Sequence, residues 1–391
     1  MKHRVRVLGV LAVTLSAGVG CGTPSPDADR SAATREATSA DSSSIGSSAP
    51  LAPATELPTA DSAPLGLASG SASAPIPSSP SAPRYPKSHG GPHEGHYQVV
   101  GATYSSDGAL LITSGFSGDI IVWNVDSWTI RRRLPPTTLM DNGWLGLRSD
   151  GAVLTCGRDR ALRAWPAIGL EPASQIELAP LTRDCLTASL DPKAGRIALT
   201  DGEVQVEVRD AQTGALQHTL RTGPIWGLAL SPDGSRLALA GAKLTIWDPV
   251  SGEQTDTVPT NKKPQNVAWR PDGRELAVGV MDGTVVLLDT RDWREVRSLP
   301  LNRWGASRLA WTPDGEVLVG AGGVTGDATI KWWADQGWHE IGASKMGSVP
   351  EELLKSPDGA TTVTVGHGGT VRFWDTHKAA QLAAVEAVRE Y

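Results

Sequence analysis

The sequence is poor in cysteine and in aromatic residues other than tryptophan, and it has no excess of basic residues. Three cysteines are too few for a disulfide scaffold and do not have zinc-finger spacing. A formal net charge of -6 argues against a nucleic-acid binder, which would carry a basic face. The sequence also has no Gly-x-Ser-x-Gly elbow and no phosphate-binding glycine loop. We therefore expect no cofactor and no nucleic-acid partner.

Tryptophan, glycine and proline are abundant instead, at 14, 43 and 28 residues of 391. No tryptophan precedes Trp123, so the core is expected in the C-terminal three quarters of the chain. The glycine and proline content is typical of a turn-rich β protein. A single core of this length would normally split into domains unless the architecture is modular.

The first 20 residues read as a targeting segment. Lys2, Arg4 and Arg6 precede an uncharged run at residues 7–19, which is too short to span a bilayer and suits a secretory signal. The run ends in small residues before Cys21 and resembles a bacterial lipoprotein signal peptide. The resemblance implies cleavage after residue 20, lipidation of Cys21 and anchoring of an exported protein at the cell envelope, at the outer membrane. An ordinary secretory signal with an incidental Cys21 is the alternative.

Residues 21–88 are rich in serine, alanine and proline and contain one aromatic residue, Tyr85. Such a composition cannot bury enough apolar surface to offset the entropy lost on ordering. We interpret this stretch as a disordered, lipid-anchored linker that holds the following domain, residues 89–391, away from the membrane.

A turn recurs through the third segment. It reads x-Ser/Pro-Asp-Gly and ends at Gly108, Gly151, Gly234, Gly273, Gly315 and Gly359, with a degenerate copy at residues 191–195. Each turn is expected to join two antiparallel strands. The repeat of about 43 residues is the length of a four-stranded propeller blade.

A strand motif recurs in the same phase. It reads Ile-Ile-Val-Trp-Asn at Trp123 and has further copies at Trp165, Trp247, Trp333 and Trp374; Leu288 and Arg209 replace the ring in two copies. Together the two motifs resemble the WD-repeat (Trp-Asp repeat) β-propeller family. The resemblance implies an all-β fold, a seven-bladed propeller of four-stranded antiparallel blades. It assigns structural repeat roles to Asp107, Trp123, Asp150, Trp165, Asp233, Trp247, Asp248, Asp272, Asp289, Asp314, Trp333, Asp358, Trp374 and Asp375.

Two modes of ring closure are open. In the first, residues 379–385 form the outer strand of the last blade. In the second, a short C-terminal helix forms on Leu382, Val385 and Val388, and residues 93–98 supply the closing strand. The triple Arg131–Arg132–Arg133 falls on the expected outer strand of the first blade, where charge protects an exposed edge from pairing with other chains.

The resemblance implies a monomeric, non-catalytic platform for unidentified protein partners. Loops between second and third strands share one end of a propeller with the loops leading into first strands. The candidate protein-binding residues at this end are Phe116, Trp144, Arg158, Arg160, Trp226, Lys262, Trp304 and His367. Packing between blades is the alternative role for each tryptophan.

Two other functions stay open: an envelope enzyme of lactonase or hydrolase type that uses the channel, and a sugar- or metal-binding receptor. Neither is favoured, because the eight histidines do not recur at the blade period. The short tract around His89, His93 and His96 is expected to be incidental rather than a metal site. Cys156 and Cys185 fall at the same end of adjacent blades. A disulfide is conceivable in an oxidising compartment, but two unbonded buried residues are the preferred interpretation.

Overall fold

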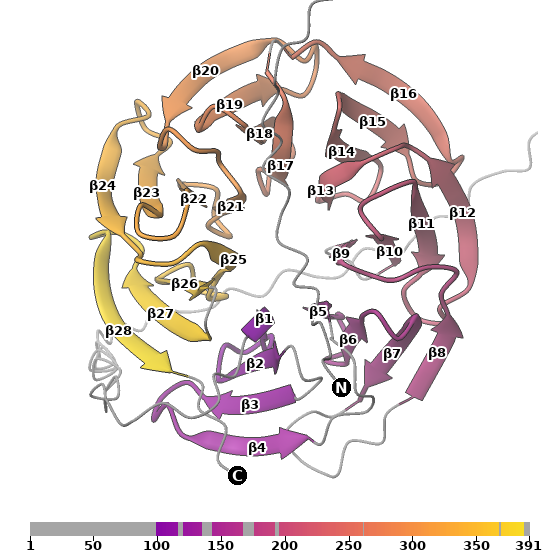
Figure 1. The fold of residues 1–391 in the computed structure, drawn as a ribbon, viewed down its shortest axis with the longest axis horizontal. Helices are drawn as coiled ribbons and strands as arrows, with labels where there is room; N and C mark the ends of the chain where they lie inside the picture. The colour runs from indigo at the N-terminus through magenta and orange to yellow at the C-terminus, as the bar shows by residue number, and fades with distance from the viewer. Residues whose placement is uncertain are drawn as a thin grey trace, which may run out of the picture. The chain divides into compact units, whose positions relative to one another are not determined.

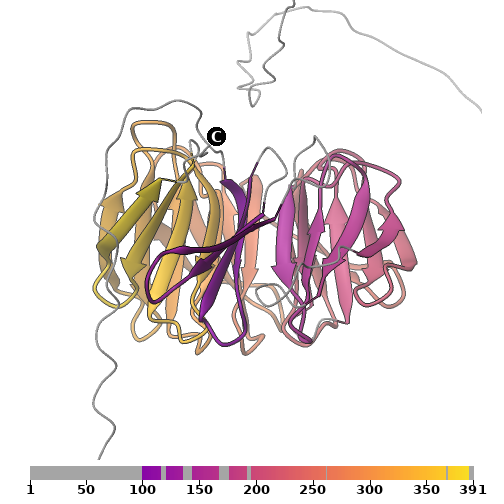
Figure 2. The same ribbon diagram turned by 90° about the horizontal axis from the view of Figure 1, so that it is seen from below.

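The computed structural model describes residues 99–115, 120–134, 143–166, 176–191, 195–260, 262–366 and 369–386. These residues form seven four-stranded antiparallel sheets arranged as blades around a central axis (Figure 1). The prediction of an all-β, seven-bladed propeller is confirmed. Figure 2 shows the blades from the side, with strands running between two opposite ends of the ring.

Each blade consists of four consecutive strands, listed here in chain order. Blades one to three contain β1 (Val99–Tyr104), β2 (Leu110–Gly115), β3 (Ile120–Asn124), β4 (Ile130–Leu134); β5 (Trp144–Leu147), β6 (Val153–Cys156), β7 (Ala161–Trp165), β8 (Ile176–Pro180); β9 (Thr187–Leu190), β10 (Arg196–Thr200), β11 (Gln205–Asp210), β12 (Leu216–Arg221). Blades four and five contain β13 (Ile225–Leu230), β14 (Leu237–Gly241), β15 (Leu244–Asp248), β16 (Glu253–Val258); β17 (Pro264–Trp269), β18 (Glu275–Val280), β19 (Thr284–Asp289), β20 (Glu295–Pro300). Blades six and seven contain β21 (Arg308–Trp311), β22 (Val317–Gly322), β23 (Thr329–Ala334), β24 (Glu340–Lys345); β25 (Pro350–Lys355), β26 (Thr361–Gly366), β27 (Thr370–Asp375), β28 (Ala380–Glu386).

The ring closes without a strand exchanged between the first and last blades. Residues 380–386 form β28, the outer strand of blade seven, as the first of the two closure modes predicted. The inner strands β1 and β25 lie against each other and complete the circle. The alternative of a short C-terminal helix on Leu382, Val385 and Val388 is therefore wrong, because the first two lie on β28. Val388 and residues 93–98 lie outside the described part of the chain.

The recurrent turn is built around its aspartate. In the first copy the Gly108 amide donates to the Ser105 carbonyl at 2.9 Å, and Asp107 accepts from the Ala109 amide at 3.0 Å. Gly108 has a φ of +71°, a left-handed conformation that favours glycine. Hydrogen bonds to its carboxylate, first from Ser105 and then from Ala109, lower the pKa of Asp107. The motif thus joins β1 to β2 and places an ionised carboxylate on the end of the ring that carries these turns.

Three of the recurrent third-strand tryptophans are buried and share one kind of partner, whereas Trp247 is half-buried and donates to Thr245 on its own strand. The indole nitrogens of Trp123, Trp165 and Trp374 donate to Thr113, Thr155 and Thr364 on the neighbouring second strand, at 2.9–3.0 Å. In each pair the threonine lies diagonally across the two strands, ten residues earlier in the chain. A buried indole N–H needs an acceptor, so this pair lets blades one, two and seven bury a large ring without an unsatisfied donor.

Blade three replaces the ring with a buried ion pair. Arg209 Nε donates to Glu207 at 2.7 Å, and the two side chains are 5% and 3% exposed. The remaining guanidinium nitrogens donate to the carbonyls of Gly214 at 2.8 Å and Pro180 at 3.2 Å. Pro180 belongs to β8 of blade two, so Arg209 also ties two blades together. In blade three, therefore, the buried Arg209–Glu207 pair takes the place that a tryptophan has in other blades.

Five further tryptophans join strands, turns and blades. Trp269 and Trp311 end the inner strands β17 and β21, and their indoles donate to the carbonyls of Ala229 and Ala268 in the preceding blades, at 2.9 and 3.2 Å. The other three occupy the turn between third and fourth strands in left-handed conformation, with φ of 54–59°: Trp128, Trp293 and Trp338. Their rings pack edge-on or tilted against Phe373, Trp269 and Trp311.

Cys156 and Cys185 are bonded, so the preferred interpretation of two unbonded cysteines is wrong. Their Cα atoms lie 5.6 Å apart, inside the range for a disulfide, and both residues are fully buried. The physical reason is a backbone hydrogen bond of 3.0 Å from the Cys185 amide to the Gly157 carbonyl, which draws the two blades together at this end.

Arg131, Arg132 and Arg133 lie on β4, the outer strand of blade one, as expected. Arg131 and Arg133 are exposed while Arg132 is half-buried, so the three residues do not form one patch.

Candidate protein-binding face

The two ends of the propeller differ in construction. One end, called the loop face below, carries the loops between second and third strands and the loops that lead into first strands. The other end, called the turn face, carries the tight turns described above. All eight candidate binding residues were expected on the loop face. The structure describes six of them; Phe116 and His367 lie outside the described residues.

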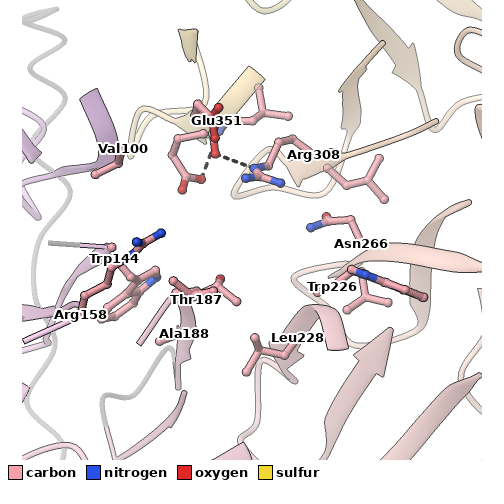
Figure 3. A pocket seen from close by; sticks show the side chains of 17 residues that line it. Val100, Trp144, Arg158, Thr187, Ala188, Trp226, Leu228, Asn266, Arg308 and Glu351 are labelled. Atoms are coloured by element: carbon pink, nitrogen blue, oxygen red, sulfur yellow. Dashed lines mark hydrogen bonds between the residues drawn. The ribbon is translucent and has the colours of Figure 1, made fainter. Parts of the chain in front are cut away.

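The mouth of the central channel on the loop face is a cavity of about 400 Å³ (Figure 3). Residues from all seven inner strands line it, and they mix polar and apolar side chains. The polar ones include Arg158, Asn266, Arg308, Glu351 and Glu352, and the apolar ones include Val100, Trp144, Trp226, Leu228 and Leu353.

Backbone groups hold the charged side chains at this mouth. Arg308 donates from Nε to the Glu351 carbonyl at 2.6 Å and from Nη1 to the Ser307 carbonyl at 2.8 Å. Glu352 accepts from the Leu353 amide at 3.1 Å. Burial raises the pKa of Glu352, and the nearby Arg308 guanidinium opposes that rise. The positions of these groups are thus fixed before any partner arrives.

A β-bulge recurs at the channel mouth. The register of the first strand shifts at its second residue in blades one, four, five and seven, at Val100, Trp226, Gln265 and Glu351. Bulges re-aim side chains out of the regular alternation. Trp226 is 50% exposed at this position, although a regular inner strand would turn it into a blade interface.

Trp304 is displayed on a rigid loop of blade six. Asn302 accepts from the Trp304 and Gly305 amides at 2.6 and 3.0 Å. The Trp304 indole donates to Asp327 at 2.9 Å, and the Arg303 guanidinium lies 4.9 Å from the ring centre. The ring is nevertheless 47% exposed. A fixed but exposed ring loses little side-chain entropy when a partner covers it.

Exposed large apolar side chains gather on the loop face. Among described residues it carries Leu186, Val204, Trp226, Met281, Trp304 and Val324, each at least 41% exposed. Five others lie on the outer strands β4, β8, β12, β20 and β28, and Val250 alone lies on the turn face. An apolar surface concentrated at one end is the usual mark of an interaction site.

The structure brings some of the predicted residues together and separates others. Trp144, Arg158 and Trp226 share the channel mouth, while Trp304 lies at blade six. Trp144 is half-buried against the core between blades two and three, and its ring covers Gly146, so packing between blades describes Trp144. It does not describe the half-exposed Trp226 or Trp304.

The two remaining predicted residues are engaged in exposed ion pairs. Arg160 pairs with Asp184 at 2.8 Å and Lys262 with Asp282 at 2.8 Å. Both pairs join loops of the loop face, and exposed pairs of this kind contribute little stability.

Sequence reasoning missed several residues of this face. Leu186, Val204, Arg308, Glu351 and Glu352 were not candidates. The repeat could have identified Glu351 and Glu352. Glu351 occupies the same position in its blade as Trp226, the second residue of the first strand.

The described residues contain no group of three or more His, Cys, Asp or Glu side chains arranged to hold a metal ion. Within the same ranges, no helix has the length and apolarity needed to cross a membrane.

Comparisons with known proteins agree with this architecture. A family profile described as "WD domain, G-beta repeat" matches residues 90–124, and one described as "Anaphase-promoting complex subunit 4 WD40 domain" matches residues 244–314. "Periodic tryptophan protein 2" of Arabidopsis thaliana is 28% identical over 204 residues, 50% of this chain and 23% of that protein. "WD repeat-containing protein VIP3" of the same plant is 32% identical over 133 residues, 29% of this chain and 41% of that protein.

A third relative is "Serine-threonine kinase receptor-associated protein" of Gallus gallus, 24% identical over 168 residues, which cover 42% of this chain and 47% of that protein. The chain spans less than half the length of each of these three relatives, all of which are eukaryotic. The chain is therefore similar to WD40-repeat proteins, and its seven sheets are the blades of a β-propeller.

Proposed function

We propose that this protein is a non-catalytic platform that binds a protein partner on its loop face and is held at the bacterial cell envelope by a lipid on Cys21. The observation that carries the binding proposal is the gathering of exposed apolar side chains on one end of the ring. Trp226 and Trp304 are the anchors, because large, half-exposed rings in fixed positions dominate the energetics of protein interfaces.

The construction of the loop face supports this role. Tight backbone hydrogen bonds fix the Trp304 loop, and a disulfide fixes the segment before β9 that presents Leu186. A face of this kind changes little on binding, so affinity is not lost to ordering. The name of the relative described as receptor-associated also points to protein binding.

The envelope proposal has two supports. The first is the sequence pattern that ends at Cys21. The second is the buried Cys156–Cys185 disulfide, because structural disulfides form and persist in oxidising compartments such as the periplasm and the cell surface.

Site-specific photo-crosslinking tests the binding proposal. A photoreactive phenylalanine analogue replaces Trp226, Trp304 or, as the matched control on the turn face, the 58% exposed Val250. We expect envelope proteins to cross-link to the full-length chain from positions 226 and 304 and not from position 250. Cross-linking from position 250 alone would refute the assignment of the face.

A triple variant measures the contribution of the anchors. Trp226→Ala, Trp304→Ala and Arg160→Ala together should abolish capture of the cross-linked partner while leaving the unfolding midpoint nearly unchanged, because all three side chains are exposed. Unchanged capture by a folded triple variant would contradict the proposal.

Metabolic labelling with palmitate tests the anchor. Label should enter the wild-type protein and not the Cys21→Ser variant, which should leave the membrane fraction. Equal labelling of the two proteins, or membrane retention of the variant, would contradict lipidation at this cysteine.

A further inference from the structure

The charges of the loop face are unequally balanced. Four of its acidic residues form ion pairs with neighbouring cations: Asp184, Asp201, Asp282 and Asp327. Three exposed cations, Arg221, Lys243 and Lys263, make no ion pair with any described residue. On the loop face of blades three to five, the exposed Glu203 likewise makes no ion pair with a described residue. On the loop face of blades three to five, three unpaired cations therefore stand against one unpaired acid, whereas Glu351 and Glu352 lie on blade seven at the same channel mouth.

The three cations border the apolar anchors. Arg221 ends β12, five residues before Trp226. The Lys243 carbonyl accepts from the Gly241 amide at 3.1 Å, and Gly241 packs against the Pro224 carbonyl, two residues before Trp226. The Lys263 carbonyl accepts from the Met281 amide at 3.0 Å. These backbone contacts thus place the three cations on loops next to those that carry Trp226 and Met281.

The turn face has the opposite charge for a structural reason. Its repeated turns each need an aspartate as backbone acceptor, which places Asp107, Asp150, Asp233, Asp272, Asp314 and Asp358 at this end. Asp150 and Asp272 pair with arginines, and the other four make no ion pair with a described residue. Hydrogen bonds from Ser231 and Ser235 lower the pKa of Asp233 to about 2. The Asp233 carboxylate therefore stays ionised well below neutral pH, and the whole chain has a net charge of -6.

We infer that the partner of the loop face presents an acidic segment with apolar side chains, which places its apolar groups on Trp226 and Met281 and its carboxylates beside Arg221, Lys243 and Lys263. This inference rests on the proposed function and names the chemistry of the partner. The acidic turn face repels such a segment while the loop face attracts it. Electrostatic complementarity of this kind mainly raises the association rate and selects the correct face.

Three synthetic peptides of equal length serve as probes. The first alternates glutamate with leucine and phenylalanine, the second replaces each glutamate with lysine, and the third replaces each apolar residue with serine. Binding is measured by fluorescence anisotropy to the full-length lipidated protein in nanodiscs of zwitterionic lipid. We expect the first peptide to bind at least about tenfold more tightly than either of the others at low salt.

Charge-reversal variants locate the effect. Arg221→Glu, Lys243→Glu and Lys263→Glu together should weaken binding of the acidic apolar peptide about tenfold at ~50 mM salt, and much less at ~500 mM, where screening is strong. The matched control reverses three exposed arginines elsewhere, Arg131→Glu, Arg274→Glu and Arg297→Glu, which changes the net charge equally. The control should alter the affinity by less than about twofold, since these residues lie on outer strands and the turn face.

The outcomes separate the two proposals. If the lysine peptide binds as tightly as the glutamate peptide, or if the control reversal weakens binding as much as the loop-face reversal, the inferred partner chemistry is wrong. If a partner cross-links from positions 226 and 304 but its affinity is unchanged by the loop-face reversal, the proposed function stands and this inference fails. If cross-links form only from the turn face, both fail.

Discussion

The buried ion pair of blade three makes the sharpest prediction for stability. Arg209→Met removes the guanidinium but keeps much of its aliphatic volume. Glu207 is then left 2% exposed without its cationic partner, although it still accepts from the Thr182 amide at 3.3 Å and from the Thr182 hydroxyl. Removing one partner of a buried ion pair costs about 3–5 kcal/mol.

The double variant separates charge burial from packing. In Glu207→Leu/Arg209→Met no buried charge remains, so the largest part of that cost should disappear. The Gly214 and Pro180 carbonyls still lack their donor, and Thr182 lacks its acceptor. An unsatisfied buried polar group costs about 1–3 kcal/mol, and the lower figure applies to groups that water can reach. Pro180 is exposed, so the lower figure applies to its carbonyl. We therefore expect the double variant to be less stable than wild type but more stable than Arg209→Met.

Urea unfolding of the full-length chain, followed by tryptophan fluorescence, measures these differences. Arg291→Met is the matched control: Arg291 pairs with Asp289 at 2.6 Å but is 82% exposed, so its loss should hardly move the midpoint. The reasoning is refuted if the two arginine variants lower the midpoint equally, or if the double variant is less stable than Arg209→Met.

Three other perturbations should each leave a distinct mark. Trp128→Ala should be less stable than Trp128→Gly by about 1 kcal/mol in the same urea assay, because both lose the ring but only glycine adopts the φ of 54° without strain; equal stabilities would contradict this. Cys156→Ser opens a loop with a sequence separation of 29 residues and should cost about 3–4 kcal/mol, whereas reduced wild type should match the variant. Burial lowers the pKa of Lys355 well below its usual value, so the unfolded chain binds the proton more readily and stability should rise with pH from the folded pKa up to about 10.5. Lys355→Met should flatten that rise in melting temperature against pH, and an unchanged slope would assign the pH dependence to other groups.

The blades were predictable because their markers are local. A turn such as that ending at Gly108 needs its aspartate and its left-handed glycine within four residues, whatever the rest of the chain does. The regular spacing of these turns predicted seven blades and an outer strand over residues 379–385. The same local logic explains Trp123, Trp165 and Trp374, whose threonine partners lie on the preceding strand of the same blade.

Contacts between blades were not predictable in this way. The bond between Cys156 and Cys185 depends on how closely blade two approaches blade three, and nothing within either blade encodes that distance. Arg209 was recognised as a departure from the repeat, but its carbonyl partner Pro180 belongs to another blade. The bulge that exposes Trp226 is a register shift, and a one-residue shift changes which side chains are buried without altering the hydrophobic pattern.

The two faces of the ring follow from these different constraints. On the turn face the repeat itself dictates the chemistry, because each turn requires an acceptor carboxylate and a glycine, and so every blade adds similar groups. On the loop face no such requirement acts: the loops differ in length, and a bulge position carries valine, tryptophan, glutamine or glutamate in different blades. A surface that must recognise one partner needs residues that differ from blade to blade. Within a sevenfold scaffold of this construction, we therefore expect specific recognition on the loop face, where Trp226 and Trp304 break the repeat.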